Sequence, residues 1–280
     1  NKVKDIFIYD FDGNMKLIEN EDTSQLVTPN HRVLNQQRYK KMKNGVVNKL
    51  WTDWQYVEAD NLTRKLDVKL PLAVIYDGSI KLGEDLSYLI GMIIADGMYH
   101  KDTNAISIFQ TSANMIIVNK IRDILNNLNI QFSEYQRERD YNEKIKSLNK
   151  YVSNYSIERI IKKFGGKTFI EYQFYFSGDI VNRIKSLFPY KELNMNALEI
   201  CYDDRLKLFD GLLDGDGSYK FYTSSRLKYN RVFWQKSFNT RLYFQLLCFS
   251  LGFKTSWNEN KQCIGIGSKG TTQIQKSFIN

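Results

Sequence analysis

The sequence predicts an α+β protein in which a mostly β region, residues 1–80, precedes two mixed α/β repeats, residues 81–200 and 201–280. The first 80 positions hold short β-like runs between turn residues, with weak helical periodicity. After them, one order of elements occurs twice: an apolar helix, a β segment and a second helix. The two first helices end at Asp96 and Asp216. This shared order predicts a pseudo-two-fold pair with antiparallel sheets.

The β region is predicted to consist of strands and turns. Ile6–Tyr9 and Leu26–Val27 are β-like runs on either side of the turn at Asp12–Asn14, and Trp51–Val57 is a third β-like segment. The turn residues between Pro71 and Ser79 mark the boundary with the first repeat.

Apolar periodicity places the elements of the repeats. The first repeat has a helix over 86–95, β residues around 106–109 and a helix over 113–128; the second has a helix over 204–215, β residues around 232–234 and a helix over 238–251. Between them, Glu134–Lys150 is densely charged, so we expect a long hairpin or an exposed loop there.

Charge favours a polyanionic partner. The 40 Lys and Arg exceed the 31 Asp and Glu, and residues 81–280 carry +8 of the formal +9. A basic excess confined to one region is typical of nucleic-acid binding. A basic protein without such a partner remains the alternative.

The cysteines and the apolar runs exclude other classes. Cys201, Cys248 and Cys263 form no CxxC pair, and the chain has only two histidines, which argues against a zinc cluster or a disulfide framework. No run reaches the ~18 apolar residues of a membrane span, and Asn1–Asp5 lacks a signal-peptide core. We therefore expect a cytoplasmic protein that does not contact a membrane.

A nine-residue pattern occurs in both repeats. Leu89–Gly97 and Phe209–Gly217 align without a gap, and each has small residues four positions apart. These small residues share one helix face, so the backbone of another helix can approach closely. The two helices are therefore predicted to pack on each other.

Each pattern ends in Asp-Gly, with the glycine expected as a C′ cap. A carboxylate at a helix C-terminus is disfavoured by the dipole, and two such carboxylates close together require a cation. Hard oxygen ligands suit Mg²⁺, which can activate water for phosphodiester hydrolysis. A single copy would be an ordinary helix stop, whereas two copies indicate a site.

The paired pattern resembles the LAGLIDADG homing endonucleases in their single-chain, two-repeat form, over about residues 81–267. The resemblance implies Mg²⁺-dependent cutting of both strands of a long, specific double-stranded DNA target by a monomer, across the minor groove and with short 3′ overhangs. Ile94 departs from the motif's usual first acid, which is not the metal ligand.

The resemblance also implies roles by position. Asp96 and Asp216 would bind the metal, with the backbone carbonyls of Ala95 and Gly215 as further ligands. Lys236, whose counterpart in the first repeat we take as Ala113, and Lys191 would position or polarise the attacking water, although Lys191 could equally be a solvated lysine.

In this family each repeat contributes a sheet whose alternate side chains enter the major groove. The matching residues here are Asn104, Ser107, Phe109, Gln110, Lys220, Tyr222, Ser224, Arg226, Lys228, Asn230 and Arg231. Without DNA binding, most of them would be ordinary exposed sheet residues.

Val27–Leu34 resembles the Thr-x-x-His block of Hint, or intein, splicing domains, in which the threonine and histidine, here Thr28 and His31, contact the scissile amide. Trp54–Leu72 resembles the strand pair that follows this block. By itself the block is weak, and a lone surface histidine is the alternative.

The chain also departs from a complete intein. Residue 1 is Asn, no Cys or Ser nucleophile with its leading strand precedes the block, no room for the second half of a Hint domain is expected after Ile264, and Asn280 lacks a penultimate histidine. We therefore expect no splicing by this chain, which would be an intein fragment, a trimmed intein or an endonuclease whose Hint remnant extends DNA contact. A catalytically weak nucleic-acid-binding module, such as a maturase or regulator, and a protein-splicing element are the alternative functions.

Overall fold

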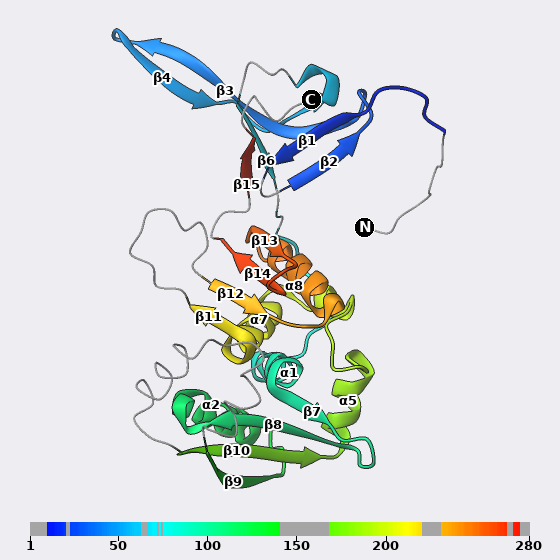
Figure 1. The fold of residues 1–280 in the computed structure, drawn as a ribbon, viewed down its shortest axis with the longest axis vertical. Coiled ribbons are helices and arrows are strands. Elements are labelled where there is room, and N and C mark those ends of the chain that lie inside the picture. Colours follow the sequence, from blue (N-terminus) through cyan, green and yellow to red (C-terminus); the bar gives the residue numbers. More distant parts are fainter. Residues whose placement is uncertain are drawn as a thin grey trace.

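The structure, a computed structural model, describes residues 10–20, 23–62, 67–71, 73, 75–140, 168–219, 231–267 and 271–274. A β unit lies at one end of the long axis, followed by the second repeat and then the first (Figure 1). The strand expected at Ile6–Tyr9 and most of the charged segment Glu134–Lys150 lie outside the described residues.

The β unit consists of a hairpin and a five-stranded sheet. β1 (Lys16–Asn20) pairs with β2 (Thr23–Val27), and the sheet has the order β15-β6-β3-β4 with β5 also paired to β3. The sheet strands are β3 (Arg32–Lys43), β4 (Val46–Trp51), β5 (Gln55–Glu58), β6 (Val68–Pro71) and β15 (Thr271–Ile274). A short 3₁₀ helix, η1 (Ala59–Asn61), follows β5, and a small core separate from that of the repeats holds the unit together.

β15 changes one expected boundary. Thr271–Ile274 pairs antiparallel with β6, so this segment belongs to the sheet of the β unit and not to the second repeat. The residues after Ile264 therefore contribute one described strand to the β unit. The repeats are an insertion between two neighbouring strands of one sheet.

The first repeat contains the predicted helices and a four-stranded sheet of order β7-β8-β10-β9. Its elements are α1 (Glu84–Asp96), β7 (Gly97–Tyr99), β8 (Ala105–Thr111), η2 (Ser112–Asn114), α2 (Met115–Asn127), β9 (Phe132–Asp140), β10 (Thr168–Ser177) and α5 (Asp179–Leu187). The described start of the charged segment lies in β9, which pairs antiparallel with β10 as in the expected long hairpin, whereas β10 and α5 were not predicted.

The second repeat has the same order of elements. They are α6 (Asn196–Glu199), α7 (Tyr202–Asp216), β11 (Gly217–Tyr219), β12 (Arg231–Trp234), α8 (Phe238–Ser250), β13 (Thr255–Asn258) and β14 (Cys263–Ile266). Its sheet order, β11-β12-β14-β13, repeats that of the first sheet element by element. The predicted repetition is therefore present in the topology.

One hydrophobic core runs through both repeats and includes buried residues of α1, α7 and both sheets. Its apolar side chains stabilise the pair as one body. No helix in the described part of the chain has the length and apolar character of a membrane span.

The glycines after the two motif helices differ from the expected C′ caps. Gly97 and Gly217 have φ of −91° and −93°, which is extended backbone and not the left-handed cap conformation. A Cβ at Gly97 would lie 2.5 Å from the carbonyl oxygen of Ile93. Glycine is required there because the strand folds back closely against its own helix.

Candidate metal centre

The helices α1 and α7 meet backbone to backbone at their glycines. A Cβ at Gly91 would collide with the backbone of Leu208, and a Cβ at Gly211 would collide with that of Tyr88. Farther along, Gly215 lies against Ala95. The small-residue face predicted from the spacing is therefore the interface, and the two helix ends come together.

This interface brings the two predicted aspartates close together. A Cβ at Gly215 would lie 3.3 Å from Oδ2 of Asp96, so the Asp96 carboxylate faces the end of α7. Burial, and then the charge of Asp96, raise the pKa of Asp216 to about 7, while the charge of Lys191 opposes the shift. The geometry thus places two carboxylates where a cation would relieve their repulsion.

Two glutamines hold these carboxylates. Nε2 of Gln110 donates to Oδ2 of Asp96 at 2.6 Å, and Nε2 of Gln235 donates to Oδ2 of Asp216 at 2.9 Å. Gly97 pairs with Ile108, and Gly217 pairs with Phe233. Gln110 and Gln235 each lie two residues beyond the paired position, so they are equivalent residues of the two repeats.

The glutamine pair changes two expectations. Gln110, predicted to read DNA bases, lies on the helix side of its sheet because it follows Ile106 and Ile108 at the two-residue strand period. Gln235 was missed, although aligning Phe109-Gln110 with Trp234-Gln235 would have found it.

Lys191 lies at the site. Its Nζ donates to the carbonyl oxygen of Ala95 at 3.3 Å, and burial lowers its pKa while the charges of Asp216 and Asp96 oppose that shift. Its backbone φ is +55°, a conformation that follows the end of α5. A half-buried lysine that feels the charges of both carboxylates can hold or orient a water molecule.

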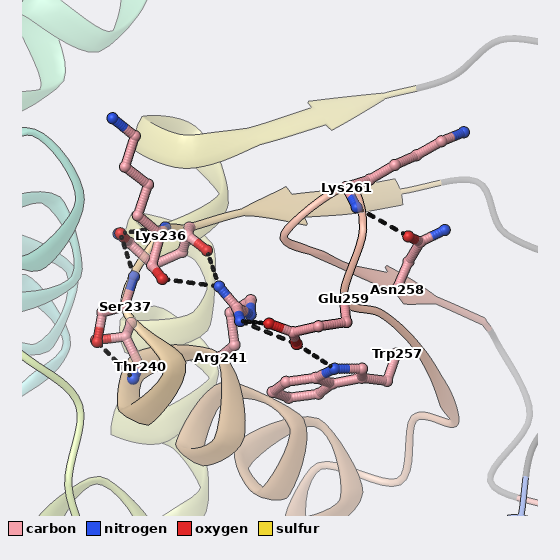
Figure 2. Close-up of polar contacts among 9 residues, drawn as sticks. Lys236, Ser237, Thr240, Arg241, Trp257, Asn258, Glu259 and Lys261 are labelled. Carbon is pink, nitrogen blue, oxygen red and sulfur yellow. Dashed lines mark hydrogen bonds and ion pairs between the residues drawn. The ribbon is translucent and has the colours of Figure 1, made fainter.

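Lys236 directly follows Gln235, the residue that bonds Asp216. Its side chain is exposed and extends away from the neighbouring polar network (Figure 2). The register of β12 makes Thr111 its counterpart, which corrects the expected pairing with Ala113. The proximity of Lys236 to the carboxylates stays a prediction.

A buried arginine, Arg241, fixes the backbone around Lys236. Arg241 donates through Nη1 to the carbonyl oxygens of Gln235 and Lys236, at 2.7 and 2.8 Å, and through Nη2 to Glu259 (Figure 2). Trp257 donates to the same carboxylate at 2.7 Å. This network positions the segment that carries Gln235.

The first sheet presents a polar and aromatic face away from the helices. Phe109 on β8, Gln173 on β10 and Tyr135 on β9 lie side by side across three strands. Ser107 lies on this face but is buried, and its hydroxyl is hydrogen-bonded to both His100 and Gln173. Arg137, at the exposed edge strand, extends this face.

Other predicted groove residues lie elsewhere. Asn104 is in the loop before β8 and bonds Asn182 and Lys185 of α5. Arg231 points to the helix side, with its guanidinium 5.1 Å from the ring centroids of Phe209 and Phe253, because it shares a strand face with buried Phe233. Lys220, Tyr222, Ser224, Arg226, Lys228 and Asn230 lie outside the described residues.

The donor set fits a hard divalent cation. Asp96 and Asp216 supply carboxylate oxygens, and the Ala95 carbonyl already accepts from a cationic group. The described residues contain no cluster of three or more His, Cys, Asp or Glu side chains. Two carboxylates with backbone oxygens suit Mg²⁺-like ions, which keep several waters and bind phosphate oxygens.

A known protein family matches the segment that contains α1 and Asp96. Residues 83–165 match the LAGLIDADG-like domain family. No curated protein matches the chain. This LAGLIDADG-like segment ends before β10, so the match covers part of the first repeat and none of the second.

Three solved structures are similar to the chain. They are the crystal structure of I-DmoI in complex with DNA and Mn, a mesophilic variant of the homing endonuclease I-DmoI, and I-DmoI in complex with DNA and Ca. Their identities are 15%, 15% and 16%, with TM-scores of 0.39, 0.39 and 0.38. Each alignment covers 66% of this chain and, respectively, 89%, 88% and 83% of the other.

Proposed function

We propose that the chain is a divalent-metal-dependent endonuclease that cuts both strands of a specific double-stranded DNA target. The observation that carries the proposal is the pairing of Asp96 and Asp216 at the touching ends of α1 and α7, each bonded by an equivalent glutamine. The LAGLIDADG-like match of residues 83–165 supports the same assignment. Mg²⁺ is the cation that we propose for this site.

The residues divide the work of phosphodiester hydrolysis. Asp96 and Asp216, with the carbonyls of Ala95 and Gly215, would hold the cation, which when bound supplies charge stabilisation and a more acidic water. Gln110 and Gln235 fix the carboxylates through their amide groups. Lys191 orients water at the scissile phosphate. The polar face of the first sheet, with Tyr135, Gln173 and Arg137, contacts the duplex.

The experiment compares Asp96→Asn and Asp216→Asn with the wild-type chain on a plasmid library that contains candidate uninterrupted target sites. Each variant should lose double-strand cleavage by about 1000-fold or more, since each ~1.4 kcal/mol of lost transition-state stabilisation is tenfold in rate. Binding to duplex DNA should persist.

Asp214→Asn is the matched control. Asp214 lies on the same helix as Asp216, but its carboxylate accepts from Tyr88 and pairs with Lys120. Cleavage by this variant should stay within a few-fold of wild type. Full cutting by the Asp96→Asn/Asp216→Asn double variant would sink the proposal.

A nucleic-acid-binding module without catalysis is the second candidate, as in a maturase or regulator. It predicts that wild type and both aspartate variants bind DNA or RNA alike and that none cleaves when Mg²⁺ is added. Glutamine contacts on both aspartates favour the nuclease, because a binding surface has no need of two partly buried carboxylates held side by side.

We also propose that the β unit is a Hint-derived splicing fold into which the repeats are inserted. The pairing of β15 with β6 supports this origin, because one sheet is built from segments on both sides of the repeats. Thr28 and His31 lie in the turn between β2 and β3, where the His31 amide donates to the Thr28 carbonyl. Mass spectrometry of the chain placed between flanking peptides would detect ligated flanks if splicing occurs.

A further inference from the structure

The hairpin formed by β3 and β4 protrudes from the β unit. Arg38–Lys43 pairs with Val46–Trp51, and the Asn44-Gly45 turn has φ of +53° and +76°, the signature of a tight type I′ turn. In Figure 1 the hairpin projects at the end of the molecule that carries the β unit, and the sheet of the first repeat lies at the opposite end. Six residue pairs give a ribbon of about 20 Å.

The ribbon is strongly basic. From Arg32 to Thr52 the chain carries two arginines and four lysines and no Asp or Glu. The near-balanced charge of residues 1–80 as a whole hides this local excess. All four lysines, Lys40, Lys41, Lys43 and Lys49, are exposed.

The strand register places positive charges against each other. Lys40 is directly opposite Lys49, and like charges in such a pair destabilise a hairpin. Alternation along the strand puts Lys41 and Lys43 on the other face of the ribbon. Lysines therefore line both faces, and an external anion on each side would stabilise them.

We propose that the β3–β4 ribbon is a DNA-binding arm that enters a major groove of duplex DNA outside the site of cleavage. A two-stranded ribbon fits the ~12 Å width of this groove, and phosphates flank the groove on both sides. Lysines on both faces match that charge distribution. The exposed apolar side chains at the tip, Met42, Val46 and Val47, face base edges and methyl groups in the groove.

Side-chain contacts fix the base of the ribbon to the sheet of the β unit. Arg38 pairs with Asp67 at 2.8 Å, and the side chain of Gln36 donates to the Thr52 carbonyl. Lys69 and Arg38 both lie over the ring of Trp51. The arm thus keeps a fixed direction relative to its sheet, so ordering it on DNA costs little conformational entropy.

The inference rests on the proposed function only in taking duplex DNA as the partner. The test measures binding of the chain to a random-sequence duplex of about 40 base pairs, in EDTA so that no metal is present. Binding is followed by fluorescence anisotropy across a series of salt concentrations. The variant is Lys40→Gln/Lys49→Gln. The slope of log affinity against log salt should fall by about 1 to 2, because each neutralised phosphate contributes about 0.9.

The matched control is Lys81→Gln/Lys207→Gln, which removes two positive charges, one just before α1 and one in the second turn of α7 where it pairs with Glu84, away from the carboxylate ends of both helices. Its salt slope should equal that of wild type. An unchanged slope in the ribbon variant, or an equal fall in both variants, overturns the inference.

Lys40→Glu separates binding from folding. It turns the like-charge pair with Lys49 into an opposite-charge pair, so the melting temperature should stay the same or rise while the DNA affinity falls. If the affinity is unchanged, the arm does not bind DNA.

The two proposals fail separately. Cleavage by wild type together with unchanged binding by the ribbon variants overturns the arm and leaves the nuclease. Loss of binding in the ribbon variants, in a chain that cuts no DNA, overturns the nuclease and supports the arm.

Discussion

At the scale of single residues, the two carboxylates have equivalent positions and unequal surroundings. Both accept from an equivalent glutamine, but the described residues place one lysine, Lys191, beside the pair. Lys191 follows α5 of the first repeat, and the described residues of the second repeat contain no equivalent lysine.

The two lysines named from the sequence give a direct comparison. Lys191→Met should slow single-turnover cleavage by about 100-fold or more, the usual contribution of a positioned proton-transfer or water-orienting group. Lys236→Met should change it by only a few-fold, because its side chain is exposed, whereas Nζ of Lys191 bonds the Ala95 carbonyl. Equal losses in the two variants would contradict the placement of Lys191.

Sequence found the aspartates because their spacing repeats, and it missed Gln235 because a glutamine beside a strand carries no pattern of its own. Gln110 was expected to face the DNA groove, but its side chain lies on the opposite face of β8, where it bonds Asp96. Which face a strand residue occupies depends on where the strand begins, and the sequence did not fix that position. Arg231 was misplaced for the same reason. One residue of register moves a side chain to the other face.

At the scale of elements, contact between α1 and α7 positions the site. No side chain separates the backbones at Gly91 and Gly211. Burial of the surrounding leucines and isoleucines stabilises this contact. The interface thus fixes how far apart the two carboxylates lie.

Gly211→Ala should destabilise the chain. Its Cβ would meet the backbone of Tyr88, which cannot move without shifting α1, so we expect a loss of about 1–3 kcal/mol or more, measured by chemical denaturation, with weaker cleavage. Gly13→Ala is the control, since the nearest atoms there belong to the movable ring of Phe11. A fully stable, active Gly211→Ala chain would refute the close packing.

Helices were predicted more completely than strands. The four helices at 84–96, 115–127, 202–216 and 238–250 matched their periodicity within a few residues. The β3–β4 ribbon was missed although Asn44-Gly45 signals a hairpin, because its exposed, lysine-rich strands lack apolar alternation. β15 was missed because its pairing partner lies about 200 residues away in the sequence.

At the scale of the whole molecule, Asp204 joins the start of α7 to the start of α1. Its carboxylate accepts from the backbone amides of Leu82 and Gly83 at 2.7 and 3.0 Å. Burial alone would raise the pKa of Asp204, but the two amide hydrogen bonds lead a set of contacts that together lower it by more than burial raises it. The pKa of Asp204 therefore lies below its usual range.

This carboxylate makes stability depend on pH. Because its folded pKa is lowered, Asp204 stabilises the chain above the unfolded pKa of about 3.9, and the contribution disappears as pH falls through the folded pKa. Asp204→Ala should cost about 1–3 kcal/mol at pH 7 and progressively less below pH 4 in urea denaturation. Asp203→Ala, an exposed neighbour, is the control, and a pH-independent difference would refute the assignment.

The pairing of β6 with β15 has a consequence for synthesis. When Pro71 leaves the ribosome, β6 has only its short pairing with β3, and its other edge stays open until Thr271 emerges. At ~5–20 residues per second, that edge waits for roughly ten to forty seconds. During this interval the unpaired strand is a template for association between nascent chains. Rapid folding of the inserted repeats, which brings the two segments together, then serves as protection against aggregation.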